Sequence, residues 1–319
     1  MKDISKILII RLSSFGDIVL TFPFINELRR LYPNARIDMV SKPQYTELSA
    51  LHPFLDSVIP FSINMKSFLQ ENNYDVVFDL QRNINSRRII PSNSEVFRVR
   101  KESWKKHLLV LTGINLLKDS VPVYEKYLNA LKDFNSSANT DFTTSDLKFS
   151  SVDSVNQNYI VLSPSSKHFT KRLPENKFAL LLKDFNTKIV ITGDNNETDL
   201  SICSYFDSEL NDSLDLCGKL SFSHLTGLIK NAEFVVCNDS GILHLSEALG
   251  KKVYVFFGST VKEFGFFPQL KSSEVEEVSG LKCRPCSHIG RKECPKKHFK
   301  CMNDIDVTKV RLKINDYSL

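Results

Sequence analysis

The sequence predicts an α/β protein with two Rossmann-like halves, each built on a parallel sheet. Apolar, β-branched runs alternate with segments of helical spacing, which is typical of βαβ units. The alternation occurs twice, on either side of a polar stretch at residues 133–157. Glycines, hydroxyls and charges gather in the loops after the apolar runs. Because ligands of such sheets bind at the carboxyl ends of the strands, we expect a central cleft lined by these loops.

In the first half, Lys6–Leu12 is a continuous apolar run, as expected of a buried parallel strand. The stretch SSFGD interrupts it, and residues 18–32 then follow helical spacing up to Pro33. The pattern of this half also predicts strands at Ala35–Ser41, Val58–Phe61 and Tyr74–Leu80 and a helix at Met65–Asn72.

Residues 133–157 are rich in Ser, Thr, Asn and Asp and show little periodicity, which indicates a linker region. We therefore predict an N-terminal domain over residues 1–150 and a C-terminal domain over residues 151–319. In the second domain the pattern predicts strands at Tyr159–Ser163, Thr187–Thr192, Leu214–Cys217, Glu233–Cys237 and Val253–Phe257. It predicts helices there at Glu175–Asp184, Ser221–Lys230 and Ile242–Leu249.

The charge balance is mildly basic, at +5 over 319 residues. Seven Lys/Arg and one Glu lie between Lys282 and Lys300. Such an excess suits an anionic small molecule or an anionic surface, and is too weak to predict a nucleic-acid partner. The apolar run ILIIRL is far shorter than the about 18–20 residues of a membrane span, and no signal peptide is visible. We expect a cytoplasmic protein, with peripheral contact to the inner membrane face.

The stretch NDSG at residues 238–241 lies between an apolar strand and an amphipathic helix. Asp and Ser there can cap the helix, and the free N–H groups of its first turn can bind an anion; the two roles are compatible. Neither a GxGxxG nor a GxxxxGK[ST] motif occurs. The sequence therefore lacks the main signal of a dinucleotide-dependent dehydrogenase or a P-loop NTPase.

Four stretches together resemble a known family. They are ILIIRLSSFGDIVLTFP at 7–23, KRLP at 171–174, NDSGILHLSEAL at 238–249 and FGST at 257–260. The sequence resembles glycosyltransferase family 9, the ADP-heptose:lipopolysaccharide heptosyltransferases. The resemblance implies a two-domain GT-B architecture, with the nucleotide-sugar donor bound by the C-terminal half.

The resemblance assigns Asp17 the role of general base in an inverting, single-displacement transfer. It assigns Lys171 to the donor diphosphate, where negative charge accumulates in the transition state. The remaining donor-site residues that it implies are Ser165, Ser166, Asp239, Ser240, Gly241 and His244. Each has a structural alternative: Asp17 as a helix cap, Lys171 as a surface lysine, and His244 as a core residue. We expect no cofactor or divalent metal in catalysis, because Lys171 and the loop N–H groups can neutralise the diphosphate.

For an anionic, lipid-linked saccharide acceptor, the candidate residues follow strands of the first half. They are Ser14, Gly16, Gln81, Arg82 and Arg87. The segment Trp104–His107, which contains the only tryptophan and two lysines, is a second candidate patch. An ordinary exposed face is the alternative for each.

Four of the seven cysteines, Cys283, Cys286, Cys294 and Cys301, lie within 19 residues of one another. Their spacing suits a structural zinc, although it is not the usual pair of CxxC motifs. Free or buried thiols are the alternative, and disulfides rank last in a cytoplasmic protein.

Two further functions stay open. One is a glycosyltransferase that uses a different nucleotide sugar. The other is a non-enzymatic protein, either a nucleotide-sugar binder or a nucleic-acid binder with a C-terminal zinc module.

Overall fold

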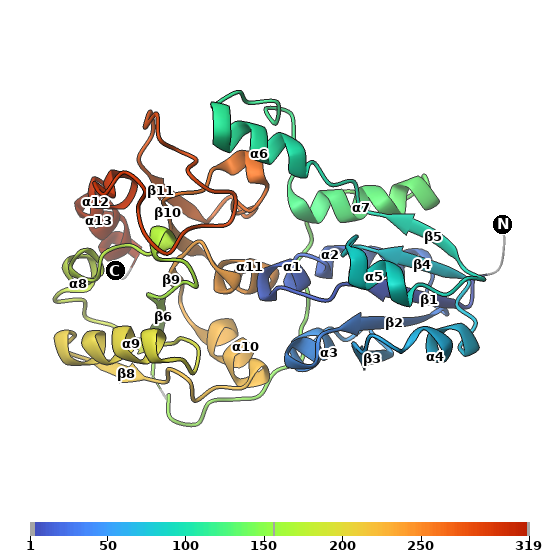
Figure 1. Ribbon diagram of the computed structural model, residues 1–319. Coiled ribbons are helices and arrows are strands. Elements are labelled where there is room, and N and C mark those ends of the chain that lie inside the picture. The colour runs from blue at the N-terminus through green and yellow to red at the C-terminus, as the bar shows by residue number, and fades with distance from the viewer. Residues whose placement is uncertain (1–3, 156, 318–319) are drawn as a thin grey trace. The chain divides into compact units, whose positions relative to one another are not determined.

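The chain forms two compact α/β units in the computed structural model, which describes residues 4–155 and 157–317 (Figure 1). The first unit comprises Met1–Lys101 and Val121–Phe149, and the second comprises Glu102–Ser120 and Ser150–Leu319. The sequence pattern placed residues 102–120 in the first half. They belong to the second unit because Leu109 and Leu117 pack with Phe264 in a small buried cluster.

The first unit contains a five-stranded parallel sheet with the strand order β3-β2-β1-β4-β5. Its strands are β1 (Lys6–Ile10), β2 (Arg36–Ser41), β3 (Ser57–Pro60), β4 (Val76–Asp79) and β5 (Glu95–Arg98). Its helices are α1 (Phe15–Val19), α2 (Phe22–Leu31), α3 (Thr46–Ala50), α4 (Lys66–Glu71), α5 (Ile84–Ile89) and α7 (Val123–Phe134), with a 3-10 turn η1 (Pro43–Tyr45).

Neighbouring residues of β4 point to opposite faces of this sheet, and both faces are buried. Val77 packs in a cluster with residues of β1, α4 and α5. The next residue, Phe78, contacts Phe24 of α2 and Phe134 of α7 edge-on, at ring-centroid distances of 5.0 and 5.8 Å. Burial on both faces explains why these strands read as continuous apolar runs.

The single helix expected over residues 18–32 is divided into α1 and α2. Thr21 closes α1 by donating its hydroxyl to the Ile18 carbonyl at 2.6 Å. Pro23 lies in the first turn of α2, where its missing N–H is not needed. The helical spacing hid this break because the apolar positions continue across it.

The second unit contains a six-stranded parallel sheet with the order β11-β10-β9-β6-β7-β8. Its strands are β6 (Tyr159–Ser163), β7 (Lys188–Ile191), β8 (Ser213–Asp215), β9 (Val235–Asn238), β10 (Val253–Phe257) and β11 (Glu274–Glu277). Its helices are α6 (Ser103–Thr112), α8 (Glu175–Leu182), α9 (Glu197–Glu209), α10 (Phe222–Asn231), α11 (Gly241–Ala248), α12 (Lys300–Asn303) and α13 (Val307–Tyr317), with 3-10 turns η2 (Phe169–Lys171) and η3 (Lys262–Phe264).

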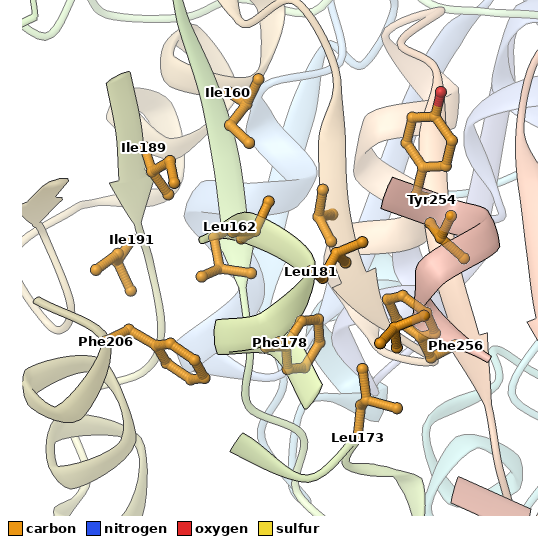
Figure 2. Packing of buried hydrophobic residues seen from close by; sticks show 14 of the residues in the cluster. Ile160, Leu162, Leu173, Phe178, Leu181, Ile189, Ile191, Phe206, Tyr254 and Phe256 are labelled. Atoms are coloured by element: carbon orange, nitrogen blue, oxygen red, sulfur yellow. The ribbon is translucent and has the colours of Figure 1, made fainter. Parts of the chain in front are cut away.

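The main core of this unit lies between the sheet and helices α8, α9, α12 and α13 (Figure 2). Phe178 of α8 meets Phe206 of α9 and Phe256 of β10 at right angles. The sequence pattern did not predict α9, β11, α12 or α13. In α9, buried Ile202, Cys203 and Phe206 alternate with acidic and hydroxyl residues, so the apolar stripe is narrow. Within the described part of the chain, no helix has the length and apolar character needed to cross a membrane.

His52 in the first unit is fully buried and hydrogen-bonded as a neutral ring. Its Nδ1 accepts from the Phe54 N–H at 3.3 Å, which leaves Nε2 to donate to Asn26 Oδ1 at 3.1 Å. Burial lowers the pKa of His52 to about 3. The unfolded chain takes up a proton near pH 6.5, whereas the folded chain does not. The stabilisation is therefore complete above pH 6.5 and is lost as the pH falls toward 3.

We predict that wild type loses about 2 kcal/mol of unfolding free energy between pH 7 and pH 5 through His52 alone. Urea titrations at both pH values measure this loss. His52→Gln removes this pH-dependent part, whereas His224→Gln, at an exposed position, leaves it in place. Equal pH dependence in wild type and His52→Gln would show that His52 is protonated in the folded protein.

Candidate active site

Asp17 lies in the loop and short helix that follow β1. Its Oδ2 accepts from the Ser14 hydroxyl at 2.8 Å, and its Oδ1 pairs with Arg11 Nη2 at 2.7 Å. The Asp17 side chain is 21% exposed, so one carboxylate is both anchored and open to solvent. The Ser14 hydroxyl is therefore used to hold Asp17. Asp17 fills the helix-capping role that the sequence left open and also forms an ion pair with Arg11.

Arg11, which interrupts the apolar run of the first strand, is buried. Its Nη1 donates to the Leu80 carbonyl at 2.7 Å, and its guanidinium lies 5.5 Å from the centre of the Tyr127 ring. Burial opposes the charge, but Asp17, Tyr127 and Asp79 together outweigh burial and raise the pKa of Arg11. Burial also raises the pKa of Tyr127, whose hydroxyl bonds to Asp17. The sequence pattern assigned no role to either residue.

Gln81 and Arg82, which the sequence proposed for the acceptor, bind backbone groups of their own unit. Gln81 Oε1 accepts from the N–H groups of Leu12 and Ser13 at 2.9 and 3.2 Å. Arg82 Nη1 donates to the Val99 carbonyl at 2.9 Å. They order the edge of the sheet around the Asp17 loop. Arg87 is exposed on α5 and stays an acceptor candidate, as does Gly16, which is partly exposed in α1.

Three charged residues that sequence reasoning passed over, Asp79, Arg98 and Lys101, lie at this same edge. Asp79, at the end of β4, is fully buried, and its Oδ2 lacks a hydrogen-bond partner among the described residues. Arg98 Nε lies 3.9 Å from that oxygen. Lys101 is exposed and interacts electrostatically with Arg11, Asp17 and Asp79. Lys101 thus places an accessible cation in the electrostatic neighbourhood of Asp17.

In the second unit, Asn238 fixes the loop that contains Lys171. Its Oδ1 accepts from the Leu173 N–H at 2.9 Å, and its Nδ2 donates to the Pro164 carbonyl at 2.6 Å. The Asn238 side chain is fully buried at the end of β9. It therefore holds both ends of the loop at residues 164–173 against the neighbouring strand.

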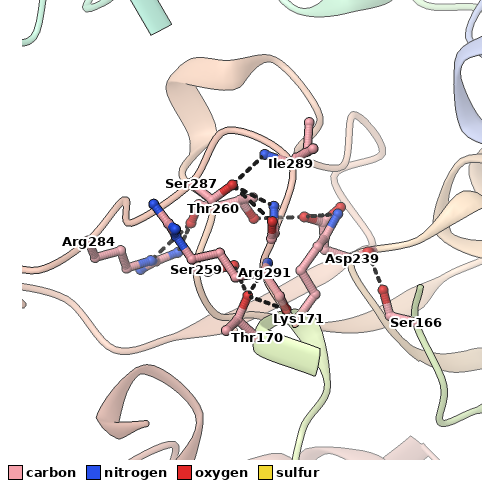
Figure 3. Close-up of polar contacts among 11 residues, drawn as sticks. Ser166, Thr170, Lys171, Asp239, Ser259, Thr260, Arg284, Ser287, Ile289 and Arg291 are labelled. Atoms are coloured by element: carbon pink, nitrogen blue, oxygen red, sulfur yellow. Dashed lines mark hydrogen bonds and ion pairs between the residues drawn. The ribbon is translucent and has the colours of Figure 1, made fainter. Parts of the chain in front are cut away.

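Lys171 forms an ion pair with Asp239 in the following turn (Figure 3). The Lys171 Nζ lies 2.7 Å from Asp239 Oδ2, and the Thr260 hydroxyl donates to the same oxygen at 2.7 Å. The Lys171 side chain is only 15% exposed and that of Asp239 only 5%. Lys171 is therefore a positioned cation rather than a solvated surface lysine.

The two serines after β6 are differently engaged. Ser165 donates its hydroxyl to Asp199 Oδ2 at 2.7 Å, which orients it toward α9. Ser166 makes only a long contact of 3.5 Å with the Asp239 carbonyl, so its hydroxyl can turn toward a ligand. Ser166 is the better donor-site candidate of the two.

Helix α11 begins at Gly241, directly after the turn that contains Asp239 and Ser240. The Ser240 Oγ atom is buried and has no hydrogen-bond partner within the described chain. Together with the free N–H groups of the first turn, this hydroxyl makes a polar end suited to an anion. His244 is buried, with its ring 5.9 Å from that of Phe266, which favours the core role for His244.

The cysteine-rich tail is attached to the loops that carry Lys171 and Thr260. Arg284 donates twice to the Thr260 carbonyl, through Nε at 2.9 Å and Nη2 at 2.7 Å. The Arg291 N–H donates to the Thr170 hydroxyl at 2.8 Å, and the Thr170 N–H donates back to the Arg291 carbonyl at 3.1 Å. The tail is therefore hydrogen-bonded to both loops of the candidate anion site.

All four tail cysteines line one small cavity, together with His298, Thr170 and Ser259. None forms a disulfide. Burial and then the nearby thiols Cys286, Cys294 and Cys283 raise the pKa of Cys301 to about 11. Among the described residues, one trio of Cys, His, Asp or Glu, namely Cys203, Asp215 and Cys217, has all its ligand atoms within 4.8 Å of one another. The tail sulfurs are thus spaced more widely than the roughly 3.8 Å of a closed tetrahedral site.

Two parallel-sheet α/β units, each with polar and charged loops at its strand ends, are the architecture of a GT-B-type glycosyltransferase. The chain belongs to glycosyltransferase family 9 (heptosyltransferase), whose model it matches over residues 63–298. It is accordingly a transferase enzyme.

Among curated proteins, the chain is 26% identical to lipopolysaccharide heptosyltransferase 1 of Campylobacter coli, over 80% of this chain and 84% of that protein. It is 24% identical to lipopolysaccharide heptosyltransferase 3 of Escherichia coli K12, over 77% of this chain and 80% of that protein.

Solved structures show the same fold. The E. coli ADP-heptose lps heptosyltransferase II has a TM-score of 0.76 at 21% identity, covering 98% of each chain. E. coli heptosyltransferase WaaC with ADP has a TM-score of 0.72 at 18% identity, covering 98% of this chain and 99% of that one. The iron-containing dodecameric glycosyltransferase TibC of enterotoxigenic E. coli H10407 has a TM-score of 0.64 at 15% identity, covering 100% of this chain and 77% of that one.

Proposed function

We propose that the protein transfers heptose from ADP-heptose to the inner core of lipopolysaccharide, with inversion at the anomeric carbon. The observation that carries the proposal is the Lys171–Asp239 pair beside the N-terminus of α11, where the buried Ser240 hydroxyl has no hydrogen-bond partner among the described residues. The names of the relatives, lipopolysaccharide heptosyltransferases, support the acceptor. The ADP of WaaC and the ADP-heptose of transferase II support the donor.

The acceptor half of the reaction belongs to Asp17. Its carboxylate takes the proton from an acceptor hydroxyl while the oxygen attacks the anomeric carbon of the sugar. The Ser14 hydroxyl and Arg11 hold the carboxylate in a single orientation, and its 21% exposure leaves room for the acceptor. Arg87 and Lys101 are two exposed cations of this unit that suit an anionic saccharide.

The donor half belongs to Lys171 and the turn at residues 239–241. As the bond from the anomeric carbon to the diphosphate breaks, its electron pair stays on the phosphate oxygen, and ADP leaves. Lys171 and the N–H groups at the start of α11 stabilise this charge, with the Ser166 and Ser240 hydroxyls as further donors. Asp239 bears a negative charge, so its part is to orient Lys171 rather than to bind the diphosphate.

We also propose that the four tail cysteines hold one structural metal ion, zinc or iron. Four thiolates suit either metal, and the cavity that they share brings the sulfurs to one place. The iron named for TibC is in keeping with this. A bound ion would draw the sulfurs closer and stiffen the loops that Arg284 and Arg291 hold. It takes no part in the transfer itself.

The donor assignment predicts selective binding of ADP over UDP and GDP in calorimetry. Lys171→Ala weakens ADP binding at least about tenfold (~1.4 kcal/mol), because one fixed cation is lost. The matched control is Lys167→Ala, which removes an exposed lysine of the same loop and leaves the affinity unchanged. If none of the three nucleotides binds, the donor site has been placed wrongly; tighter UDP or GDP binding would instead point to another nucleotide sugar.

The base assignment predicts that Asp17→Asn lowers kcat by about 10²–10⁴-fold, since the amide cannot accept the acceptor proton. Its affinity for ADP, measured by calorimetry, stays at the wild-type value. Asp133→Asn, which breaks an exposed ion pair with Arg100, leaves both quantities unchanged. A kcat within a few-fold of wild type in Asp17→Asn would assign proton removal to another group.

The metal assignment predicts about one zinc or iron per purified chain by elemental analysis, and loss of that metal in Cys286→Ser. Removing the ion also lowers the ADP affinity and the unfolding temperature, because the tail braces the Lys171 loop. Cys217→Ser separates the two candidate groups. Metal loss in Cys217→Ser alone assigns the ion to Cys203, Asp215 and Cys217, and a metal-free wild type leaves the tail as packed thiols.

A further inference from the structure

Helix α6 packs with one side against the second unit, so its opposite side faces solvent. Lys106 donates its Nζ to the Phe264 carbonyl at 2.8 Å and lies over the Phe266 ring at 5.2 Å. Leu109 is buried against Phe264. These contacts attach one side of α6 to the η3 segment of the second unit.

The opposite side of α6 exposes large apolar side chains at helical spacing. Trp104 is 62% exposed and Leu111, seven residues later, is 82% exposed, with the exposed His107 between them. The segment after α6 continues the surface with Ile114 at 54% and Leu116 at 49%. We call these five residues the α6 face. Apolar side chains exposed singly are ordinary, but four large ones exposed within thirteen residues are unusual for a surface that contacts only water.

A cationic loop of the tail joins this patch. The His288 ring meets the His107 ring edge-on at a centroid distance of 4.7 Å. The next residue, Ile289, is 55% exposed, and Arg291 and Lys292 follow as exposed cations. Lys118, just beyond the α6 face, is exposed as well. Three exposed cations and two exposed acids, Asp119 and Glu293, thus flank the apolar side chains, which leaves a small excess of positive charge.

We propose that the α6 face binds the surface of an anionic lipid bilayer. This inference rests on the proposed function, in that a lipid-linked acceptor lies at such a surface. Leucine and isoleucine side chains enter the acyl boundary, a tryptophan suits the headgroup level, and lysines and arginines pair with anionic headgroups. A second copy of this chain is the competing occupant, and it fits less well because lysine is depleted from protein–protein interfaces.

The only tryptophan of the chain lies in the α6 face, so its fluorescence reports directly on this surface. We expect vesicles of phosphatidylcholine with phosphatidylglycerol to shift the emission to shorter wavelength, and brominated lipids to quench it. Pure phosphatidylcholine vesicles give a smaller effect, and raising the salt to about 0.5 M weakens binding to the anionic vesicles. An emission spectrum that anionic vesicles leave unchanged contradicts the proposal.

Vesicle sedimentation then tests the individual side chains. Leu111→Ser combined with Ile114→Ser is expected to weaken partitioning onto anionic vesicles at least about tenfold. The control pair Leu180→Ser with Leu312→Ser removes two leucines that are 51% and 63% exposed on α8 and α13. An equal loss in both pairs, or a wild-type dimer that Leu111→Ser converts to a monomer, overturns the membrane assignment.

Failure of this inference is distinguishable from failure of the proposed function. The vesicles contain neither saccharide nor nucleotide, and ADP affinity is measured separately on the same protein. If the chain binds ADP but not vesicles, only the membrane proposal for the α6 face is contradicted. If the chain binds vesicles but no nucleotide, the membrane proposal is supported and the donor-site proposal is contradicted.

Discussion

The buried side chain of Asn238 is the contact on which the candidate donor site depends. It joins the end of β9 to both ends of the loop at residues 164–173, through the Pro164 carbonyl and the Leu173 N–H. That loop carries Lys171, and the residue after Asn238 is the Asp239 that pairs with Lys171. One amide therefore sets the distance between the cation and the N-terminus of α11. Because the amide is fully buried, leaving either hydrogen bond unmade would cost the desolvation of a polar group.

In both units the proposed functional group is paired with a buried side chain of opposite charge. The functional group is an acid in the first unit and a cation in the second. In the first, the acid Asp17 is partly exposed and its cation Arg11 is buried; in the second, the cation Lys171 is held by the buried acid Asp239. In each case a buried partner of opposite charge orients the more accessible group. The two pairs also keep a net charge out of the sheet edge, where an unpaired buried ion would be costly.

The sequence predicted the parallel strands well because burial on both faces produces uninterrupted apolar runs such as those of β1 and β9. It also predicted that the polar loops lie at one edge of each sheet, because they follow the carboxyl ends of parallel strands. It did not separate residues that bind ligands from residues that bind backbone. Gln81 and Arg82 occupy the same kind of position as Asp17, yet they satisfy N–H and carbonyl groups of neighbouring loops. Arg11 was hidden for a different reason: the Leu80 carbonyl and the Tyr127 ring that hold it beside Asp17 are distant in the sequence, and only the fold brings them to it.

The attachment of the tail to the donor loops has a consequence for how a chain is completed. Lys171, Asp239 and Thr260 all precede the tail in the sequence, whereas Arg284 and Arg291 come later and hold the loops from behind. A nascent or prematurely ended chain that stops before residue 284 has every residue proposed for the donor site but lacks the hydrogen bonds from Arg284 and Arg291. In such a chain the Thr260 carbonyl and the Thr170 hydroxyl lose these hydrogen bonds, so the loops at 164–173 and 258–260 are less firmly held.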